Sequence, residues 1–510
     1  MRTASQQRRD IECSDRPIRV SAVTIVATGG LVAWLAASGP SDGTLAQENR
    51  AGAKAPNTPG PSLGSPIPAL ALSPPSTAIK VTIYHPDSQH VWNRLHRALW
   101  VRIGPDGKEY GHDRRDPLLW TETKYLVEGK PHELAIAVLD EFLAKHGEKL
   151  VNDPLKRAIL QRDLWAVFDW TAEPGADPAG AHLRRAPSPR RALQLRLART
   201  IQRLALTPDQ IKALPDNYAA ASSSRAFAEN HDPDHPDRPF LPPDLLQTRG
   251  PWVEVEIDNG STATAPRHVH DFGARAAFRV FLRLPEGREA TIAYFDKLRD
   301  VPRPWLVARE PDRQQDTLVL NSELPQFPAG TQAALIRQML LVDTDGRIAA
   351  TRLTEDVQIR VFRAIPKLMR DRARGRASSG DQDAYEFIRS RAMLFDKECG
   401  GLLPLGTDEK DFRTQLQVHP FDQFESPPDR VPFERRMGQT MQSCTACHDG
   451  PGIYSVQSYV GGNSRAGRYY LPVLQESDNA DRQGEFSTWS KRQQYSWGLL
   501  QGLWEAKPSR

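Results

Sequence analysis

Apolar positions in residues 79–250 recur at the spacing of α-helices. In the stretch HELAIAVLDEFLAKHG, Leu134, Val138 and Phe142 fall on one stripe. The stretch NDPLKRAILQRDLWAVFDW begins with Asp153 as a cap, followed by a proline at the first helical position. The stretches PRRALQLRLARTIQRLAL and TPDQIKAL continue the pattern. We therefore predict that this region is mainly helical.

From residue 251 the apolar period changes to two. Apolar and charged residues alternate in WVEVEI, FRVFLRL and VQIRVFR, which is typical of strands with one buried face. The stretch LIRQMLLVDTDGRIAATRL reads as a hairpin that turns at Asp345 and Gly346. Residues 251–366 are therefore predicted to form an antiparallel sheet, in the manner of a sandwich.

Helical spacing returns after residue 366. It is visible in DAYEFIRSRAMLFDKEC, in ERRMGQTMQS and in the closing stretch STWSKRQQYSWGLLQGLWEA. We expect the closing helix to pack on the second of these stretches and to bury its tryptophans. The predicted fold class is α+β and multidomain, with a helical region over 79–250, a β-rich domain over 251–366 and a helical region over 367–510.

The N-terminus has the pattern of an export signal. Several arginines precede the apolar run at residues 20–38, and small residues follow it up to a plausible cleavage point after residue 46. The run is also long enough to remain as a membrane anchor. Either outcome places the bulk of the chain outside the cytoplasm, in the periplasm or cell envelope. Residues 47–78 are rich in proline, alanine and glycine, and we interpret them as a disordered linker.

Composition adds few constraints. The formal net charge of +4 in 510 residues gives no pull toward nucleic acid, and we predict no nucleic-acid partner. The chain holds 4 cysteines, of which cleavage after residue 46 would remove Cys13. The odd number that remains does not fit a disulfide framework built from pairs.

Two of these cysteines belong to a motif that carries chemistry. Cys444, Cys447 and His448 form the pattern C-x-x-C-H, which is the attachment signature of c-type haem. On a helix, Cys447 lies about 60° to one side of Cys444 and His448 about 40° to the other. All three side chains then share one face. Two thiols can bond the haem vinyl groups while the imidazole reaches the iron.

Residues 441–452 resemble the haem-attachment segment of bacterial c-type cytochromes. The resemblance covers only this part of the chain. It implies one covalently attached haem c, with Cys444 and Cys447 as tethers and His448 as the proximal iron ligand. It also implies a cytochrome-c-like helical region over residues 367–510.

Other interpretations of the cysteines stay open. Cys444 and Cys447 can form a local disulfide or a redox pair, although no βαβ pattern surrounds them. A structural zinc site can combine them with Cys399 and a histidine. Cys399 by itself is expected to be a buried residue on an apolar helix face.

The second axial ligand is not given by the motif. No methionine or histidine follows His448, so the donor comes from upstream or is a tyrosine, a lysine or water. His419 is the nearest upstream histidine and our candidate for the distal ligand. Met437 and Met441 fall on the attachment helix and are expected to pack against the haem. Candidates of lower rank are two histidine pairs and four tyrosines: His231 with His235, His268 with His270 on one strand face, and Tyr454, Tyr459, Tyr469 and Tyr470.

These patterns favour an exported monohaem protein that transfers electrons to or from a redox partner protein. A haem peroxidase or a gas or redox sensor is the alternative if the distal side of the iron is open. A cell-envelope interaction protein with a structural haem or zinc site is a third possibility. No nucleophile elbow, P-loop, zinc-protease or dinucleotide motif is present.

Overall fold

The computed structural model describes most of the chain beyond residue 81. The described residues are 82–114, 116–119, 123–172, 186–257, 263–272, 274–301, 305–308, 317–321, 323–365, 381–412, 422–425, 432–441, 448, 450–456, 474–479 and 481–505. All of them belong to one compact unit, residues 72–510. The predicted export signal at 1–46 and the predicted linker at 47–78 lie outside the described residues.

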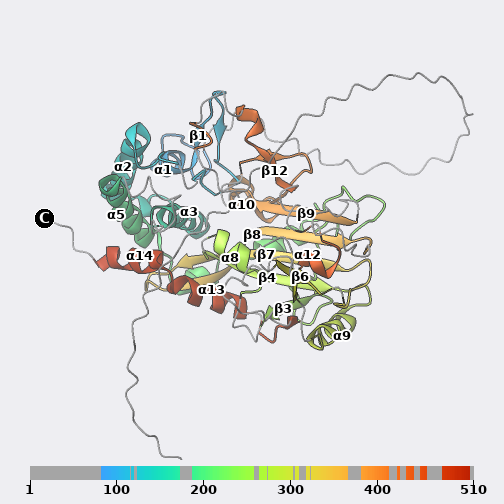
Figure 1. The fold of residues 1–510 in the computed structure, drawn as a ribbon. Helices are drawn as coiled ribbons and strands as arrows, with labels where there is room; N and C mark the ends of the chain where they lie inside the picture. Colours follow the sequence, from blue (N-terminus) through green and yellow to red (C-terminus); the bar gives the residue numbers. More distant parts are fainter. Residues whose placement is uncertain are drawn as a thin grey trace, which may run out of the picture. The chain divides into compact units, whose positions relative to one another are not determined.

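The main sheet has seven antiparallel strands in the order β10-β9-β8-β7-β4-β3-β13 (Figure 1). Their bounds are β3 (Val253–Ile257), β4 (Ala276–Arg283), β7 (Gln332–Val342), β8 (Ile348–Phe362), β9 (Gln382–Arg389), β10 (Leu402–Pro404) and β13 (Leu474–Glu476). The hairpin between β7 and β8 turns through Gly346, whose φ of 73° suits glycine. The predicted antiparallel pairing and the predicted hairpin are both confirmed.

Three shorter pairs of antiparallel strands accompany the main sheet. They are β1 (Arg102–Ile103) with β2 (Glu109–Tyr110), β5 (Trp305–Ala308) with β6 (Thr317–Leu320), and β11 (Lys410–Asp411) with β12 (Gly438–Gln439). The protein is therefore a mixed α and β structure with an antiparallel sheet.

The predicted N-terminal helices are present. They are α1 (Val91–Trp100), α2 (Gly129–Ala144), the 3-10 turn η1 (Gly147–Lys149), α3 (Pro154–Ala172), α5 (Pro187–Leu204), α6 (Pro208–Lys212) and α7 (Asn217–Ser223). Asp153 caps α3 by accepting from the backbone N–H of Leu155, at 2.8 Å. Thr207 and Gln210 form a reciprocal capping box at the start of α6.

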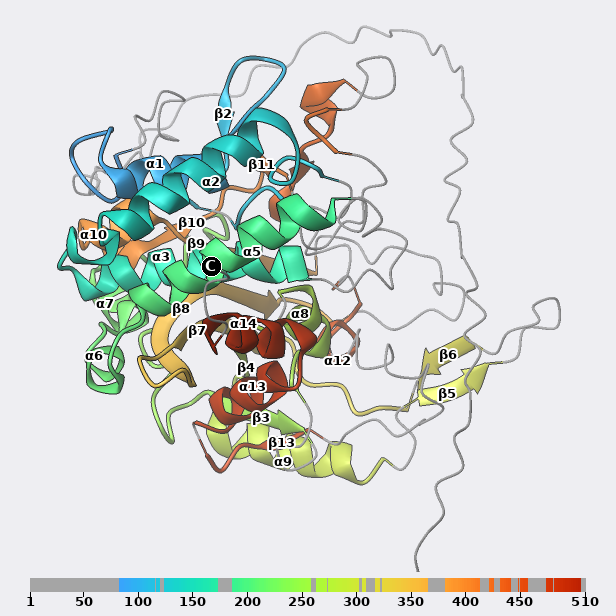
Figure 2. The same ribbon diagram turned by 90° about the vertical axis from the view of Figure 1, so that its left-hand side faces the viewer.

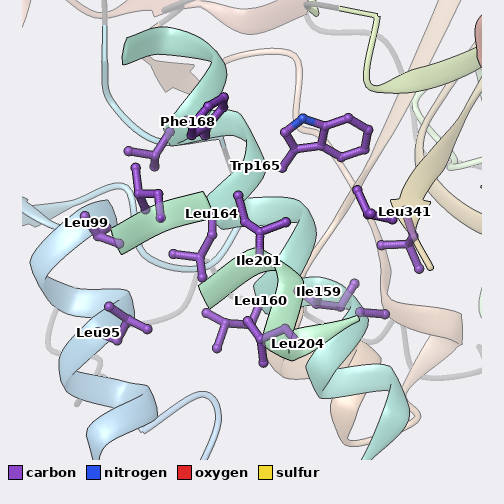
Figure 3. Packing of buried hydrophobic residues seen from close by; sticks show 14 of the residues in the cluster. Leu95, Leu99, Ile159, Leu160, Leu164, Trp165, Phe168, Ile201, Leu204 and Leu341 are labelled. Atoms are coloured by element: carbon purple, nitrogen blue, oxygen red, sulfur yellow. The ribbon is translucent and has the colours of Figure 1, made fainter. Parts of the chain in front are cut away.

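These helices bury a common apolar core, part of which Figure 3 shows. Leu95 from α1, Leu164 from α3 and Ile201 from α5 are fully buried in it, together with Leu341 of β7. The same cluster includes Leu500 of the C-terminal helix α14. This one core therefore contains residues from each of the three regions predicted from the sequence. The boundaries predicted at residues 250 and 366 stay predictions.

The two faces of the sheet are covered by different elements. Alternate residues of β8, including Val357 and Ile359, pack with α7 on one face. Phe278 of β4 and Phe362 of β8 belong to apolar clusters on the other. That second face is covered by α8 (Pro266–Asp271), α9 (Arg288–Arg299), α12 (Ile453–Val456) and α13 (Arg482–Arg492). In Figure 2, α8 and α12 both lie on one side of the sheet, and α6 and α7 lie on the other.

The stretch DAYEFIRSRAMLFDKEC is not the predicted helix. Its first part forms strand β9, and only α10 (Arg391–Phe395) and the 3-10 turn η5 (Cys399–Gly401) are helical. Tyr385 and Phe387 fit a period of two as well as a helical stripe. Pairing with β8 over Gln382–Ile388 decides in favour of β structure.

Two further predicted helices differ from the structure. In ERRMGQTMQS, the 3-10 turn η6 (Phe433–Arg435) is followed by strand β12, and helix resumes only at Thr440. Met437 and Met441 therefore do not share one continuous helix. The closing stretch forms two helices, α13 and α14 (Tyr495–Glu505), which pack on different elements.

The closing helix α14 packs on the N-terminal helices α3 and α5. Trp497 is buried in the shared core, as predicted for a core tryptophan, and Trp504 donates from its indole N–H to the carbonyl oxygen of Ala198 at 2.7 Å. Trp489 and Tyr495 are exposed. Within the described ranges, no helix has both the length and the apolar character needed to cross a membrane.

Candidate functional site

The structure describes one of the three residues of the C-x-x-C-H motif. His448 is described, whereas Cys444, Cys447 and the candidate distal ligand His419 lie outside the described residues. Their predicted roles stay predictions. The site can therefore be built only from His448 and the residues around it.

His448 precedes a short segment, residues 450–456, that is held firmly against the sheet. Ile453 and Tyr454 of this segment are buried in an apolar cluster with Phe362 of β8. The side chain of Gln326 bonds the segment twice: its amide donates to the carbonyl oxygen of Pro451 at 3.2 Å, and its oxygen accepts from the N–H of Ile453 at 3.0 Å. The segment thereby fixes the position of the residues bonded to it, including His448.

Ser455 binds His448 reciprocally. The backbone carbonyl oxygen of Ser455 lies 2.8 Å from Nδ1 of the imidazole, and the Ser455 hydroxyl donates to the carbonyl oxygen of His448 at 2.8 Å. A carbonyl oxygen can only accept, so Nδ1 carries the proton. In the neutral ring the lone pair is then on Nε2, and Nε2 is the nitrogen with which such a tautomer binds a metal.

Burial, and after it the positive charge of Arg360, lowers the pKa of His448 to about 3. The hydrogen bond to Ser455 acts in the opposite direction, and His268 adds a smaller lowering effect. The imidazole is therefore neutral at physiological pH. A neutral imidazole is the form that binds metal ions.

The ring of His448 lies next to that of His268. The ring centroids are 6.2 Å apart and the planes differ by 18°. His268 lies in α8, which is a helix and not the strand predicted for the stretch RHVH. Its ring also contacts Phe278 of β4, at a centroid distance of 5.8 Å. Two imidazoles from distant parts of the sequence thus meet over one face of the sheet.

Strands β8 and β9 contribute polar groups on the same side. Gln382, the first residue of β9, donates to the carbonyl oxygen of His448 at 2.8 Å. Its side-chain oxygen accepts from Arg360 of β8 at 3.3 Å. Arg360 is buried, so its charge acts on His448 through little solvent. This chain of hydrogen bonds couples the histidine backbone to the sheet.

The residues around His448 fit a haem iron or another metal that takes nitrogen ligands. The imidazole is neutral, its Nδ1 is engaged by a carbonyl oxygen, and a second imidazole is close. Phe278, whose ring contacts that of His268, belongs with Phe272 to an apolar cluster of α8 and β4. Such surroundings suit a hydrophobic macrocycle better than a hydrated ion such as Mg²⁺.

His231 and His235, the other candidate histidine pair, bind different carboxylates and do not form one site. His231 Nε2 is 2.9 Å from Asp383 on the opposite face of the sheet. His235 is exposed, and its Nδ1 is 2.9 Å from Asp232, which raises the pKa of His235. No cluster of three or more metal-ligating side chains is found among the described residues.

Several other candidate residues have structural roles. Met437 packs against an aromatic cluster formed by Phe412, Phe424 and Phe433. The hydroxyl of Tyr454 donates to the carbonyl oxygen of Asn321 at 2.9 Å. Met441 is buried. Cys399 is a free cysteine that is half-buried in a 3-10 turn, where it packs against the apolar cluster under α7. Tyr459, Tyr469 and Tyr470 lie outside the described residues.

Sequence reasoning missed a set of buried charges between the helices and the sheet. Arg391 binds Asp163 through two parallel hydrogen bonds of 2.7 and 2.8 Å, and both side chains are fully buried. Arg162 pairs with Glu355 at 3.0 Å in the same region. The tertiary fold pairs these groups with one another, which is typical of a structural network.

A cavity of about 440 Å³ opens next to β3 and β4. Arg279 and Arg288 line it, and they pair with Glu254 and Glu476 of the same wall. Because these charges compensate one another, the cavity shows no preference for an anionic or a cationic ligand.

Comparison with known proteins does not identify the chain. No protein-family model matches it, and neither a curated protein nor a solved structure shows significant similarity to it.

Proposed function

We propose that the chain is an exported c-type haem protein that transfers electrons outside the cytoplasm. The observation that carries this proposal is the histidine of the C-x-x-C-H motif. His448 follows two cysteines at the spacing of covalent haem attachment, and its Nδ1 is bonded to the carbonyl oxygen of Ser455. The motif supplies the tethers and the hydrogen bond directs Nε2 to the metal.

The haem would be held by Cys444 and Cys447 through two thioether bonds and by His448 as proximal ligand. The haem c iron supplies one-electron transfer between Fe(III) and Fe(II) when it is bound. Ser455 orients the imidazole and, by accepting its N–H, makes Nε2 more basic. Gln382 and Gln326 fix the backbone on either side of this contact.

Arg360 tunes the electrostatics of the site. Its buried guanidinium lies close enough to His448 to lower the pKa of that imidazole. A fixed positive charge favours the metal state that holds one more electron, so Arg360 raises the reduction potential. The effect of Arg360 on the reduction potential is set within this chain and does not require a bound redox partner.

The wider assignment follows from the sequence. Residues 1–46 act as a signal peptide or as a membrane anchor through residues 20–38, and residues 367–510, which also supply β9, β10 and β13 of the main sheet, carry the haem-binding motif. The remainder of the chain docks a redox partner protein or positions the haem near one. This placement outside the cytoplasm supports the haem proposal, because c-type haem is attached there.

We predict that the protein, produced in a host that matures c-type cytochromes, keeps its haem through denaturing electrophoresis. Haem-dependent peroxidase staining should mark a band at the mass of the protein. The double variant Cys444→Ser/Cys447→Ser should lose that band, because both thioether bonds are gone. Mass spectrometry should show one added haem on the wild type and none on the double variant.

Cys399→Ser is the matched control. Cys399 is outside the motif, so this variant should keep the full haem signal. Wild-type protein that contains zinc and no iron, or that has two unmodified thiols in the motif after maturation, would contradict the proposed function.

A further inference from the structure

The cavity of about 440 Å³ lies at the edge of the main sheet, where β4, β3 and β13 meet the start of α9. In Figure 2, β3, β13 and α9 lie together at this edge. The volume is within the range of small-molecule sites in proteins, about 300–1,000 Å³. The lining includes neither His448 nor any other residue of the C-x-x-C-H motif, so a ligand here does not require a haem.

Six charged side chains line this cavity, three of each sign. The cations are Arg249, Arg279 and Arg288, and the anions are Glu254, Glu476 and Asp478. A ligand with a net charge meets as many like charges as opposite ones in these walls. The lining therefore favours a ligand whose net charge is zero.

Two ion pairs hold the walls in place. Arg279 of β4 donates through Nε and Nη2 to the carboxylate of Glu254 on β3, at 2.9 and 2.6 Å. Arg288 of α9 bonds Oε1 of Glu476 and donates to two backbone carbonyl oxygens just before β3, at 3.0 and 3.1 Å. These bonds connect the strands to the helix, so the shape of the cavity does not depend on a ligand.

Side chains of both signs keep unused hydrogen-bonding capacity. The guanidinium of Arg249 is exposed and has no hydrogen bond or ion pair among the described residues. Nη1 of Arg279 is not used by Glu254, and of the two oxygens of Glu476 only Oε1 is bonded to Arg288. Donors that suit a carboxylate and an acceptor that suits an ammonium thus line one cavity.

The aromatic residues of the lining do not offer a stacking surface. Trp252 and Phe281 are only 1% and 3% exposed. The indole N–H of Trp252 is also engaged, since it donates to Asp244 at 3.0 Å. A nucleobase or another flat ring binds on the open face of an aromatic side chain, and these two rings have none. The ligand is therefore expected to be held by its charges and not by a stacked ring.

We propose that this cavity binds a free α-amino acid in its zwitterionic form. The carboxylate of the ligand accepts hydrogen bonds from Arg249 and from Nη1 of Arg279, and its ammonium donates to Glu476. The net charge of zero matches the balanced lining, and Leu246 provides an apolar contact for the side chain of the ligand. The site adds a small-molecule binding function that is separate from electron transfer.

The test is isothermal titration calorimetry of the full-length protein with the standard L-amino acids, each at millimolar concentration. At least one should bind with a stoichiometry of one site per chain. That amino acid is then compared with its α-amide, which lacks the carboxylate, and with its deamino acid, which lacks the ammonium. Each analogue should bind about 10- to 100-fold more weakly, because one charge-assisted contact is lost.

Two variants assign the contacts. Arg249→Ala removes the proposed carboxylate donor. Glu476→Gln removes the negative charge but keeps an oxygen for Arg288. Each should weaken binding about 10-fold or more. Arg225→Ala is the matched control, because Arg225 is also exposed and has the same φ of 60° as Arg249 but lies outside the lining. This variant should bind like the wild type.

Several outcomes would overturn the amino-acid site. They are the failure of every amino acid to bind, equal affinity for the deamino acid, an unchanged affinity of Arg249→Ala, and tighter binding of glucose, which would indicate a site for neutral sugars. The haem content of the same samples is measured separately. A protein without covalent haem that binds an amino acid would contradict the proposed function and leave this inference standing.

Discussion

At the scale of single residues, one hydrogen bond sets the tautomer of the His448 imidazole. The carbonyl oxygen of Ser455 accepts the Nδ1 proton and leaves the lone pair on Nε2. Burial and the neighbouring charge of Arg360 hold the pKa of the ring low, so protonation does not compete with a metal at neutral pH. The sequence places two cysteines shortly before this histidine, and the tertiary contact with Ser455 fixes its tautomer.

Asp163 shows how strongly a buried charge depends on its partners. Its carboxylate binds Arg391 through two hydrogen bonds, and both groups are inaccessible to solvent. We predict that Asp163→Asn lowers the free energy of unfolding by about 3–5 kcal/mol, because it removes the carboxylate that accepts two hydrogen bonds from the buried Arg391 guanidinium. Urea unfolding followed by circular dichroism measures the change.

The control for this prediction is an exposed ion pair. Asp296 and Arg299 pair at 2.9 Å within α9, and more than half of each side chain is accessible to solvent. Asp296→Asn should change the free energy of unfolding by about 1 kcal/mol or less. Equal effects of the two substitutions would show that burial does not govern the Asp163 pair.

At the scale of elements, the segment 450–456 is the device that positions His448. Gly452 has a φ of 55°, and a Cβ at this position would meet the side-chain oxygen of Gln326. That oxygen accepts from the N–H of Ile453. Because Gly452 has no Cβ, the side chain of Gln326 can approach the backbone of the segment and accept the hydrogen bond from Ile453.

We predict that Gly452→Ala destabilises the protein by at least about 1 kcal/mol, because the backbone is strained and the Gln326 contacts must shift. Gly498→Ala is the matched control. Gly498 is exposed in helix α14 with nothing within 4 Å of an added Cβ. Its replacement should add about 0.5–1 kcal/mol of stability. Thermal unfolding of both variants checks the opposite signs, and a stabilised Gly452→Ala would contradict the first.

Strand and helix patterns were predictable where the signal was local. The hairpin at Gly346 follows from two alternating stretches around an Asp-Gly turn, and α3 follows from its Asp153 cap and the proline at its first position. Strand β9 was not predictable in the same way. Its apolar residues fit both periods, and the choice comes from hydrogen bonds to β8.

At the scale of the whole molecule, buried ion pairs join the first and last parts of the chain. Asp169 of α3 accepts from Lys491 of α13 at 2.5 Å and from Arg275, next to β4, at 2.7 Å. The pKa of Lys491 is lowered to about 8, mainly by burial; the charge of Asp169 opposes this effect, and that of Arg275 adds to it. The Asp169 carboxylate thus pairs with two buried cations, one beside β4 and one in α13.

This arrangement gives a pH dependence with a definite sign. The pKa of Lys491 is lower in the folded state than in the unfolded chain, so the unfolded state binds more protons between about pH 8 and 10.5. The contribution of Lys491 to stability therefore rises as the pH increases through that window, by on the order of 3 kcal/mol.

Urea midpoints of wild type and Lys491→Met between pH 7 and 10 isolate the effect. The substitution removes the titrating group and leaves Asp169 paired with Arg275. The wild type should gain stability relative to the variant as the pH rises. A difference that stays flat or changes in the other direction would show that Lys491 titrates normally in the folded protein.

Local patterns in the sequence were enough to predict the helices α2, α3, α5 and α6, the hairpin of β7 and β8, and the C-x-x-C-H motif with His448 as its candidate iron ligand. These features depend on residues close together in the chain, so local spacing carries them. Only the tertiary structure brought His268 to His448, placed α14 on α3 and α5, and paired Asp163 with Arg391. Those contacts join segments far apart in sequence, and they arise from packing across the sheet, which no local pattern encodes.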